Sequence, residues 1–214
     1  MKSIFIKLIL PGILLSSSIA VSQCTENLNN GQPLSTTLPD LSDTLENEAN
    51  AELSMGIRYL REEEKLARDV YLFLYEKFPL RPFDNISKSE QAHMDAMKYL
   101  LDLYELEDPA ANQAEGEFTN AELQELYNEL TKKGSLNEVE ALKVGAYIEE
   151  VDILDLLEQL EHTEGHEELN RVYSNLCRAS ENHLRAFVRV LGRYSVDYTP
   201  VLLSEDQFRE IIEY

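Results

Sequence analysis

Glutamate and histidine side chains recur at helical spacing inside otherwise apolar stripes of this 214-residue chain. The clearest case is the pair Glu90 and His93, which shares one stripe with Met97, Leu100 and Tyr104. Residues three or four positions apart lie on the same face of a helix, so this stripe should turn a carboxylate and an imidazole toward the protein interior. Because an unpaired buried carboxylate costs several kcal/mol, the pattern requires a counter-charge inside the fold.

Three other predicted helices each carry one residue of this kind on an apolar stripe: Glu64, Glu150 and His183. Both glutamates have a neighbour on a partly apolar stripe, Glu63 and Glu149, so the choice within each pair stays open. A pair of divalent metal ions would supply the common counter-charge. Carboxylate oxygens mixed with imidazole nitrogens suit iron or manganese, and zinc is also compatible with them. The predicted metal ligands are therefore Glu64, Glu90, His93, Glu150 and His183.

Each of these residues also has a simpler explanation. Glu90 stands three positions after Ser87 and could close a capping box at a helix start. Either histidine alone could be a hydrogen-bonded core residue, and Glu62, Glu63 and Glu64 together resemble a solvated acidic turn. The occurrence of five ligand-type residues on the inner faces of four helices favours the metal site.

The apolar periodicity predicts an all-α domain over residues 53–214, with no alternating strand pattern. We expect a long helix that ends at Pro79 and a second that opens after Ser87. A short helix should follow Thr119, in a capping box with Glu122, and a second box should start a long helix at Ser135. The last two helices are expected over residues 167–194 and after Ser204. Four long helices with a short helix between the second and third predict a four-helix bundle with a crossover connection.

The N-terminal segment predicts export. Residues 1–23 combine two lysines, a short apolar run and several small residues, as in a secretory signal peptide. Two processing routes are open: cleavage after Ser22, or lipid attachment to Cys24. Residues 24–52 read as a polar, acidic tether. We expect a periplasmic, extracellular or membrane-anchored protein.

Composition excludes several classes of function. Forty acidic residues against nineteen Lys and Arg give a formal net charge of -21, so the chain lacks the basic surface that nucleic acids or anionic membranes require. Only two cysteines are present, which excludes a zinc site built on several thiolates. The acidic excess itself says little about chemistry.

At the predicted ligands the chain resembles a ferritin-like family of prokaryotic proteins known only as a domain of unknown function. Four stretches match the family, each numbered here at its first residue: Arg61-Glu-Glu-Glu-Lys-Leu-Ala-Arg-Asp-Val-Tyr, Ser89-Glu-Gln-Ala-His-Met-Asp-Ala, Gly145-Ala-Tyr-Ile-Glu-Glu-Val-Asp-Ile and Asn182-His-Leu-Arg-Ala-Phe. The resemblance implies a ferritin-like bundle, and the wider superfamily carries a glutamate three residues before its last histidine. Ser180 stands at that position here, which leaves five protein ligands.

The resemblance further implies a carboxylate-bridged pair of iron ions that reacts with oxygen or peroxide, as in a ferroxidase or a peroxidase. The alternative is a non-catalytic exported helical module that binds a structural metal or a partner protein. A homodimer is compatible with either function.

Overall fold

The computed structural model describes residues 41–213, which contain six helices and no strand, so the all-α prediction is confirmed for this part of the chain. Residues Ala51–Tyr214 form one compact unit, and the account below concerns that unit. The predicted signal peptide and Cys24 lie outside the described residues. The helices are α1 (Leu41–Lys77), α2 (Arg81–Leu103), α3 (Ala121–Gly134), α4 (Glu138–Leu160), α5 (Glu167–Arg193) and α6 (Glu205–Glu213).

The first two helix boundaries correct the sequence-based expectations. Helix α1 begins at Leu41, so the last twelve residues of the expected polar tether belong to this helix. It ends just before Pro79, as predicted, because a proline ring disfavours the helical conformation of the residue that precedes it. Helix α2 begins at Arg81 with a proline in its first turn, seven residues earlier than expected.

This earlier start of α2 removes the simpler explanation for Glu90. Ser87 lies inside the helix, and its hydroxyl donates to the carbonyl of Asp84, one turn back. Glu90 is therefore an interior helical residue, and the capping-box interpretation is wrong. The caps of the next two helices are also shifted, since Asn120 and Asn137 accept the first backbone amides of α3 and α4 in place of Thr119 and Ser135.

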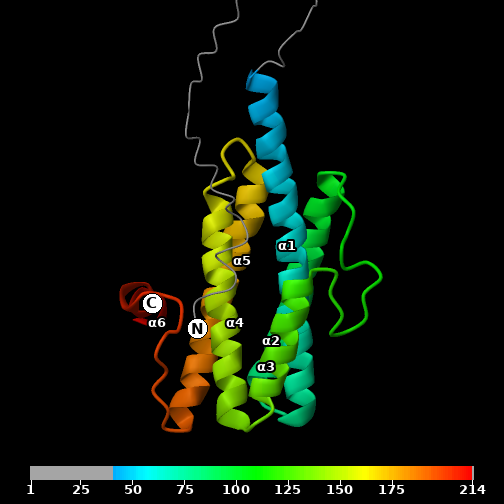
Figure 1. Cartoon of the computed structure of the whole chain (residues 1–214). Helices are drawn as coiled ribbons and strands as arrows, with labels where there is room; N and C mark the ends of the chain where they lie inside the picture. The colour runs from blue at the N-terminus through cyan, green and yellow to red at the C-terminus, as the bar shows by residue number, and fades with distance from the viewer. Residues whose placement is uncertain (1–40, 214) are drawn as a thin grey trace, which may run out of the picture. The chain divides into compact units, whose positions relative to one another are not determined.

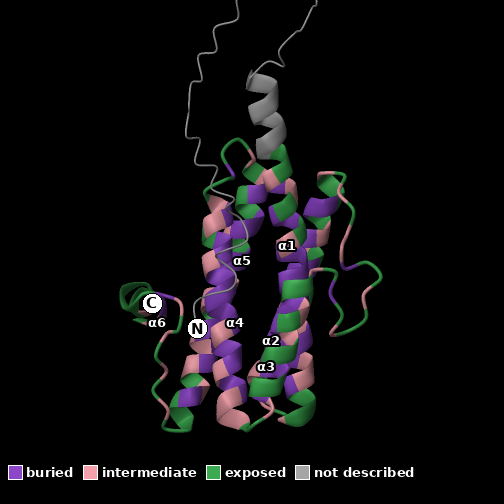
Figure 2. Ribbon diagram, in the orientation of Figure 1, coloured by how far each residue is buried: buried purple, intermediate pink, exposed green. Residues whose placement is uncertain are grey.

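The long helices α1, α2, α4 and α5 lie alongside one another, with their buried faces turned inward (Figures 1 and 2). An aromatic cluster joins α1, α2 and α5: the ring centroids of Tyr71, Phe83 and Phe187 lie 5.4 to 6.1 Å apart. Gly145 on α4 completes this contact, because a Cβ atom there would lie only 2.4 Å from the Phe187 ring. All three rings are fully buried, so they fix the spacing of the helices around the site.

Charged residues of α1 anchor the connection between α2 and α3. The Lys65 ammonium is almost fully buried and donates to Asp69 and to the carbonyls of Ala114 and Glu117, at 2.6 to 3.0 Å. Asp69 also accepts the backbone amide of Gly116 at 2.9 Å. Asp69 therefore helps to hold this connection against α1.

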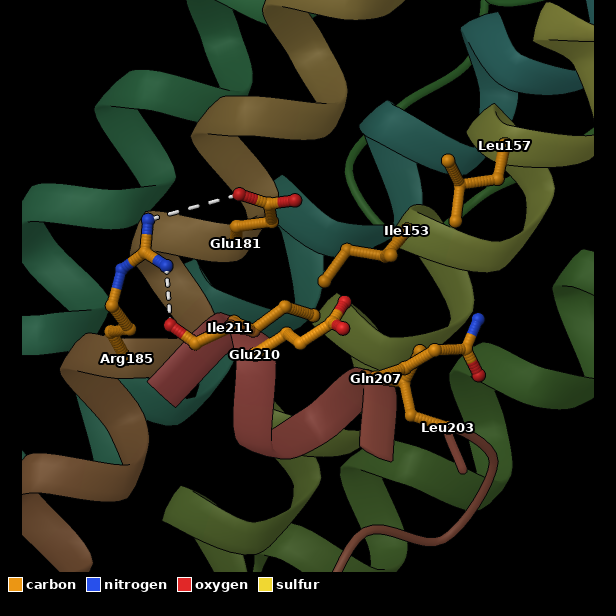
Figure 3. A pocket seen from close by; sticks show the side chains of 8 residues that line it. All are labelled: Ile153, Leu157, Glu181, Arg185, Leu203, Gln207, Glu210 and Ile211. Atoms are coloured by element: carbon orange, nitrogen blue, oxygen red, sulfur yellow. Dashed lines mark hydrogen bonds and ion pairs between the residues drawn. The ribbon is translucent and has the colours of Figure 1, made fainter. Parts of the chain in front are cut away.

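The C-terminal segment lies against α4 and α5 (Figure 3). Arg185 of α5 donates to the carbonyl of Ile211 at 2.6 Å, and its other guanidinium nitrogen lies 3.8 Å from Glu181. A pocket of about 430 Å³ remains beneath α6, between Ile153, Leu203 and these charged groups. None of the predicted metal ligands lines it. No helix among the described residues is long and apolar enough to cross a bilayer.

Candidate metal centre

Two groups of metal-ligating side chains meet between the long helices. Glu64 of α1 lies with Glu90 and His93 of α2, and Glu90 lies again with Glu149 of α4 and His183 of α5. Within each group the ligand atoms lie within 4.8 Å of one another, and every member is buried. Glu90 belongs to both groups. A carboxylate shared in this way has one oxygen available for each of two neighbouring ions.

The distances show how Glu90 divides its two oxygens. Its Oε2 lies 2.7 Å from Nδ1 of His93, and its Oε1 lies 2.9 Å from Nδ1 of His183. Nδ1 of His93 also lies 3.1 Å from Oε2 of Glu64, while Nδ1 of His183 lies 3.4 Å from Oε2 of Glu149. The two imidazole rings stack with their centroids 5.5 Å apart. The arrangement is therefore roughly symmetric about Glu90, with one histidine and one further glutamate on each side.

The structure brings four of the five predicted ligands together, and it corrects the fifth. Glu149, not Glu150, lies in the cluster. The Glu150 carboxylate is fully buried elsewhere, where it accepts the Tyr198 hydroxyl and the consecutive backbone amides of Val201, Leu202 and Leu203 at 2.6 to 3.1 Å. Sequence periodicity could not separate the two glutamates because α4 is buried on nearly all sides.

The close contacts at the cluster are not satisfied as hydrogen bonds. Neither oxygen of Glu90 has a hydrogen-bond partner, and the same is true of Oε2 of Glu149 and Nδ1 of His183. Nδ1 of His93 lies within hydrogen-bond distance of Glu64, at 3.1 Å. Buried carboxylates that converge on two imidazoles with so few well-formed hydrogen bonds are unfavourable for a protein alone, whereas metal ions would satisfy them. The donor set, three carboxylates with two imidazoles, fits iron or manganese.

The electrostatics of the cluster are those of paired opposite charges. Burial lowers the pKa of His93 and of His183, but their carboxylate neighbours outweigh burial and raise these pKa values to about 11 and about 10. Burial raises the pKa of Glu64 to about 7, against the opposing effect of His93. For Glu90, burial is outweighed by the two histidines, and its pKa falls to about 2. Without metal, the imidazoles are therefore protonated at neutral pH.

Two side chains outside the cluster orient its members, and the sequence alone did not single them out for these roles. The Ser89 hydroxyl lies 3.0 Å from Nε2 of His183 and 3.5 Å from Nε2 of His93, so it fixes both rings with Nδ1 facing the cluster. The Tyr71 hydroxyl donates to Oε1 of Glu149 at 2.6 Å. Such partners hold metal ligands in their binding orientation.

One surface pocket reaches the cluster. It measures about 340 Å³, lies between α2 and α5, and includes His93 among its lining residues. Its walls are formed by small and apolar side chains such as Ala96, Val172 and Leu176, with Tyr99 and Arg171 also lining it. Of the side chains in the two ligand groups, His93 is the one that lines this pocket.

The other histidines of the chain lie away from the cluster. Nδ1 of His166 lies 3.0 Å from the Tyr104 hydroxyl, beyond the end of α2, and His162 lies in the turn after α4. Neither belongs to a group of three or more potential ligands within the described residues.

Comparison with known proteins identifies relatives without a described function. Residues 54–214 match an uncharacterized protein domain, DUF2202. The chain is 52% identical over 157 residues to the uncharacterized protein MJ0754 of Methanocaldococcus jannaschii, covering 73% of this chain and 84% of that protein. A crystal structure of hypothetical protein MJ0754 is similar with a TM-score of 0.73 at 50% identity, covering 75% of this chain and 91% of that one. The chain therefore belongs to the DUF2202 family of uncharacterized protein domains.

Proposed function

We propose that the four long helices form a ferritin-like bundle that holds two iron ions and uses them to reduce oxygen or peroxide. The observation that carries this proposal is the position of Glu90, whose two buried oxygens each face one imidazole nitrogen but have no hydrogen-bond partner. One ion would be held by Glu64, Glu90 and His93, and the other by Glu90, Glu149 and His183. Manganese is the nearest alternative metal by donor chemistry.

When bound in the ferrous state, the two ions together can supply two electrons to a small oxidant. The residues of this chain hold the ions and exclude bulk water. Ser89 keeps both imidazoles turned toward the ions, and Tyr71 holds Glu149. His93 separates the ions from the α2–α5 pocket, which is the route we assign to the oxidant.

The apolar walls of the pocket support this assignment. Oxygen and hydrogen peroxide are both small and uncharged at neutral pH, so they can enter between side chains such as Ala96, Val172 and Leu176.

The direct test is metal content. We expect protein purified without a histidine tag, and then loaded anaerobically with Fe²⁺, to bind two ions per chain and to oxidise them when oxygen or peroxide is added. A chain that binds no transition metal under these conditions would contradict the proposal. Two bound ions with no reaction toward either oxidant would favour the alternative, a structural metal site.

We also propose that the protein is exported, through the predicted signal peptide at residues 1–23. Labelling the producing cells with a radioactive fatty acid distinguishes the two processing routes. Label on Cys24 indicates a lipoprotein, and an unlabelled protein outside the cytoplasm indicates simple cleavage.

A further inference from the structure

Arg61 is a buried cation of α1 that reaches both α2 and the connection between α2 and α3. Its exposed fraction is 8%, and all three of its guanidinium nitrogens donate hydrogen bonds. Nε and Nη2 donate to the two oxygens of Asp108 at 3.1 and 3.0 Å, and Nη1 donates to the backbone carbonyl of Met94 at 2.8 Å. Because the guanidinium is planar and held at three points, its position and orientation are fixed.

The contact with Met94 lies next to the first ligand group of the candidate metal centre. Met94 directly follows His93 on α2, and Arg61 stands three residues before Glu64 on α1. Two contacts therefore bridge α1 and α2 within one turn of each other: Arg61 to the Met94 carbonyl, and Oε2 of Glu64 to Nδ1 of His93 at 3.1 Å. Arg61 binds the backbone of α2, so it restrains the helix itself rather than one rotatable side chain.

Asp108 holds Arg61 in the orientation that makes this contact. The side chains of the two residues are 10% and 8% exposed, and a buried guanidinium without a counter-charge would be costly. Asp108 also accepts the backbone amide of Ala110 at 2.9 Å, which fixes the carboxylate in turn. With two nitrogens bound to Asp108, the third can face only α2.

Other charged residues on α1 make contacts of a different kind. Glu62 accepts two backbone amides just before α3, at 2.5 to 3.4 Å, and these contacts anchor the connection without involving α2. Arg68 does reach α2, but it donates to the Gln91 side chain at 2.6 Å in an exposed contact. An exposed contact between two side chains restrains helices weakly. Arg61 is therefore the residue best placed to set the separation of Glu64 and His93.

We propose that Arg61 is a positioning residue for the first metal ion: held by Asp108, it fixes α1 against α2 so that Glu64 and His93 reach the same ion. This inference rests on the two-metal function proposed above. It makes the α2–α3 connection, through Asp108, part of what determines the affinity of the first ion. The second ion does not depend on Arg61, because its ligands lie on α2, α4 and α5.

The test is the effect of Arg61→Lys on each ligand group separately. Lysine keeps the positive charge, but its single nitrogen cannot hold Asp108 and the Met94 carbonyl in one fixed geometry. Glu149→Gln disables the second group and leaves the first, while Glu64→Gln does the reverse. Anaerobic titration with Co²⁺, followed by its visible absorption, gives the affinity and reports the coordination geometry in each background.

We expect Arg61→Lys to weaken Co²⁺ binding at least about tenfold in the Glu149→Gln background, as is typical when a group that supports a metal ligand is lost. The Co²⁺ spectrum should change there as well. In the Glu64→Gln background, affinity and spectrum should both stay unchanged. Asp108→Asn is a second variant and should have the same selective effect, because it removes the carboxylate that orients Arg61.

Glu62→Gln is the matched control. It weakens another anchor between α1 and the same connection, so it should lower the urea midpoint of the metal-free protein. Because its contacts do not involve α2, Co²⁺ affinity should be unchanged in both backgrounds. If Arg61→Lys weakens binding equally in both backgrounds, or if Glu62→Gln weakens the first ion as much, Arg61 serves only general stability and the inference is overturned.

The remaining outcomes separate this inference from the proposed function. A wild type that binds two ions, with an Arg61→Lys variant that binds both with unchanged affinity, refutes the role of Arg61 alone. A Glu149→Gln protein that binds no Co²⁺, while the wild type does, contradicts the independent first group on which the inference depends. A wild type that binds no transition metal refutes the two-metal function, and the role of Arg61 with it.

Discussion

Glu149 and Glu150 are neighbours in the sequence, but their carboxylates have different partners. Glu149 lies 3.4 Å from Nδ1 of His183 and accepts the Tyr71 hydroxyl. Glu150 accepts three consecutive backbone amides and a tyrosine hydroxyl from the segment that precedes α6. Consecutive side chains on α4 point in directions about 100° apart. Glu149 therefore faces the candidate metal centre, while Glu150 faces the C-terminal segment.

Substitutions of the two glutamates should therefore have different effects, one on metal content and the other on stability. Glu149→Gln should reduce the metal content without lowering metal-free stability, because it removes a negative charge from a crowded buried site. Glu150→Ala should leave the metal content near that of the wild type and destabilise the protein by roughly 3 kcal/mol, because several buried amides lose their acceptor. Metal analysis and urea unfolding of the metal-free proteins measure both effects. The reverse pattern would restore Glu150 as the ligand.

Helix number and the faces of α2 and α5 followed from the sequence because these helices have a polar side. On them the apolar stripe is one-sided, so Glu90 and His183 could be placed inward by counting. On α1, every residue from Leu60 to Ala67 is buried, so counting could not separate Glu64 from Glu63. Helix α4 offers no such contrast, since residues from Ala141 to Gln159 are buried around most of its circumference. The sequence of α4 therefore shows that the helix is largely apolar, but not which of its residues face the candidate centre.

Partners supplied by distant segments were also beyond prediction. The role of Glu150 depends on backbone amides about fifty residues away, and backbone groups leave no signature in the sequence. The start of α2 was misplaced for a related reason. Ser87 has the side chain of a cap, but it bonds within the helix to Asp84 instead.

The Ser89 hydroxyl should control metal affinity without binding metal. Ser89→Ala removes the group that both imidazole Nε2 atoms face, so the rings lose a fixed orientation. We expect about tenfold weaker metal binding, as is typical when the partner of a metal-bound histidine is removed. Competition with a chromophoric chelator measures this change.

Ser87→Ala is the matched control for that experiment. It lies two residues earlier on α2, and its hydroxyl bonds only to the carbonyl of Asp84. Its metal affinity should equal that of the wild type. Equal losses in both variants would mean that α2 as a whole, rather than the orientation of the imidazoles, determines binding.

Metal binding should release protons. The pKa values of His93 and His183 are raised to about 11 and about 10, so both rings are protonated at pH 7 and must lose a proton to bind metal through Nδ1. About two protons should be released from the histidines when both ions bind, and the apparent affinity should rise with pH between 6 and 9. Calorimetry in buffers of different ionisation enthalpy counts these protons. Binding that releases none would contradict the assignment of both rings.

The same histidines make the metal-free protein sensitive to alkaline pH. Their folded-state pKa values lie above the usual value near 6.5, so the stability that protonation of the two rings contributes is fully present below about pH 6.5. This contribution is lost as the pH rises through about 10 to 11. Urea unfolding of the metal-free protein between pH 6 and 11 should therefore show falling stability at the alkaline end. His93→Gln should show a smaller fall over the same range.

Gly145 should be essential to the spacing of helices around the site. A methyl group there would lie 2.4 Å from the Phe187 ring, which is itself packed against Tyr71 and Phe83. Gly145→Ala should destabilise the protein by about 1 to 3 kcal/mol, the usual cost of overpacking a core. Gly192→Ala is the matched control, because a Cβ there would meet nothing within 4 Å, and alanine is the better helix former. We expect the control to be neutral or more stable by up to about 1 kcal/mol in urea unfolding. Equal effects at both positions would show that the aromatic cluster does not set the approach of α4 to α5.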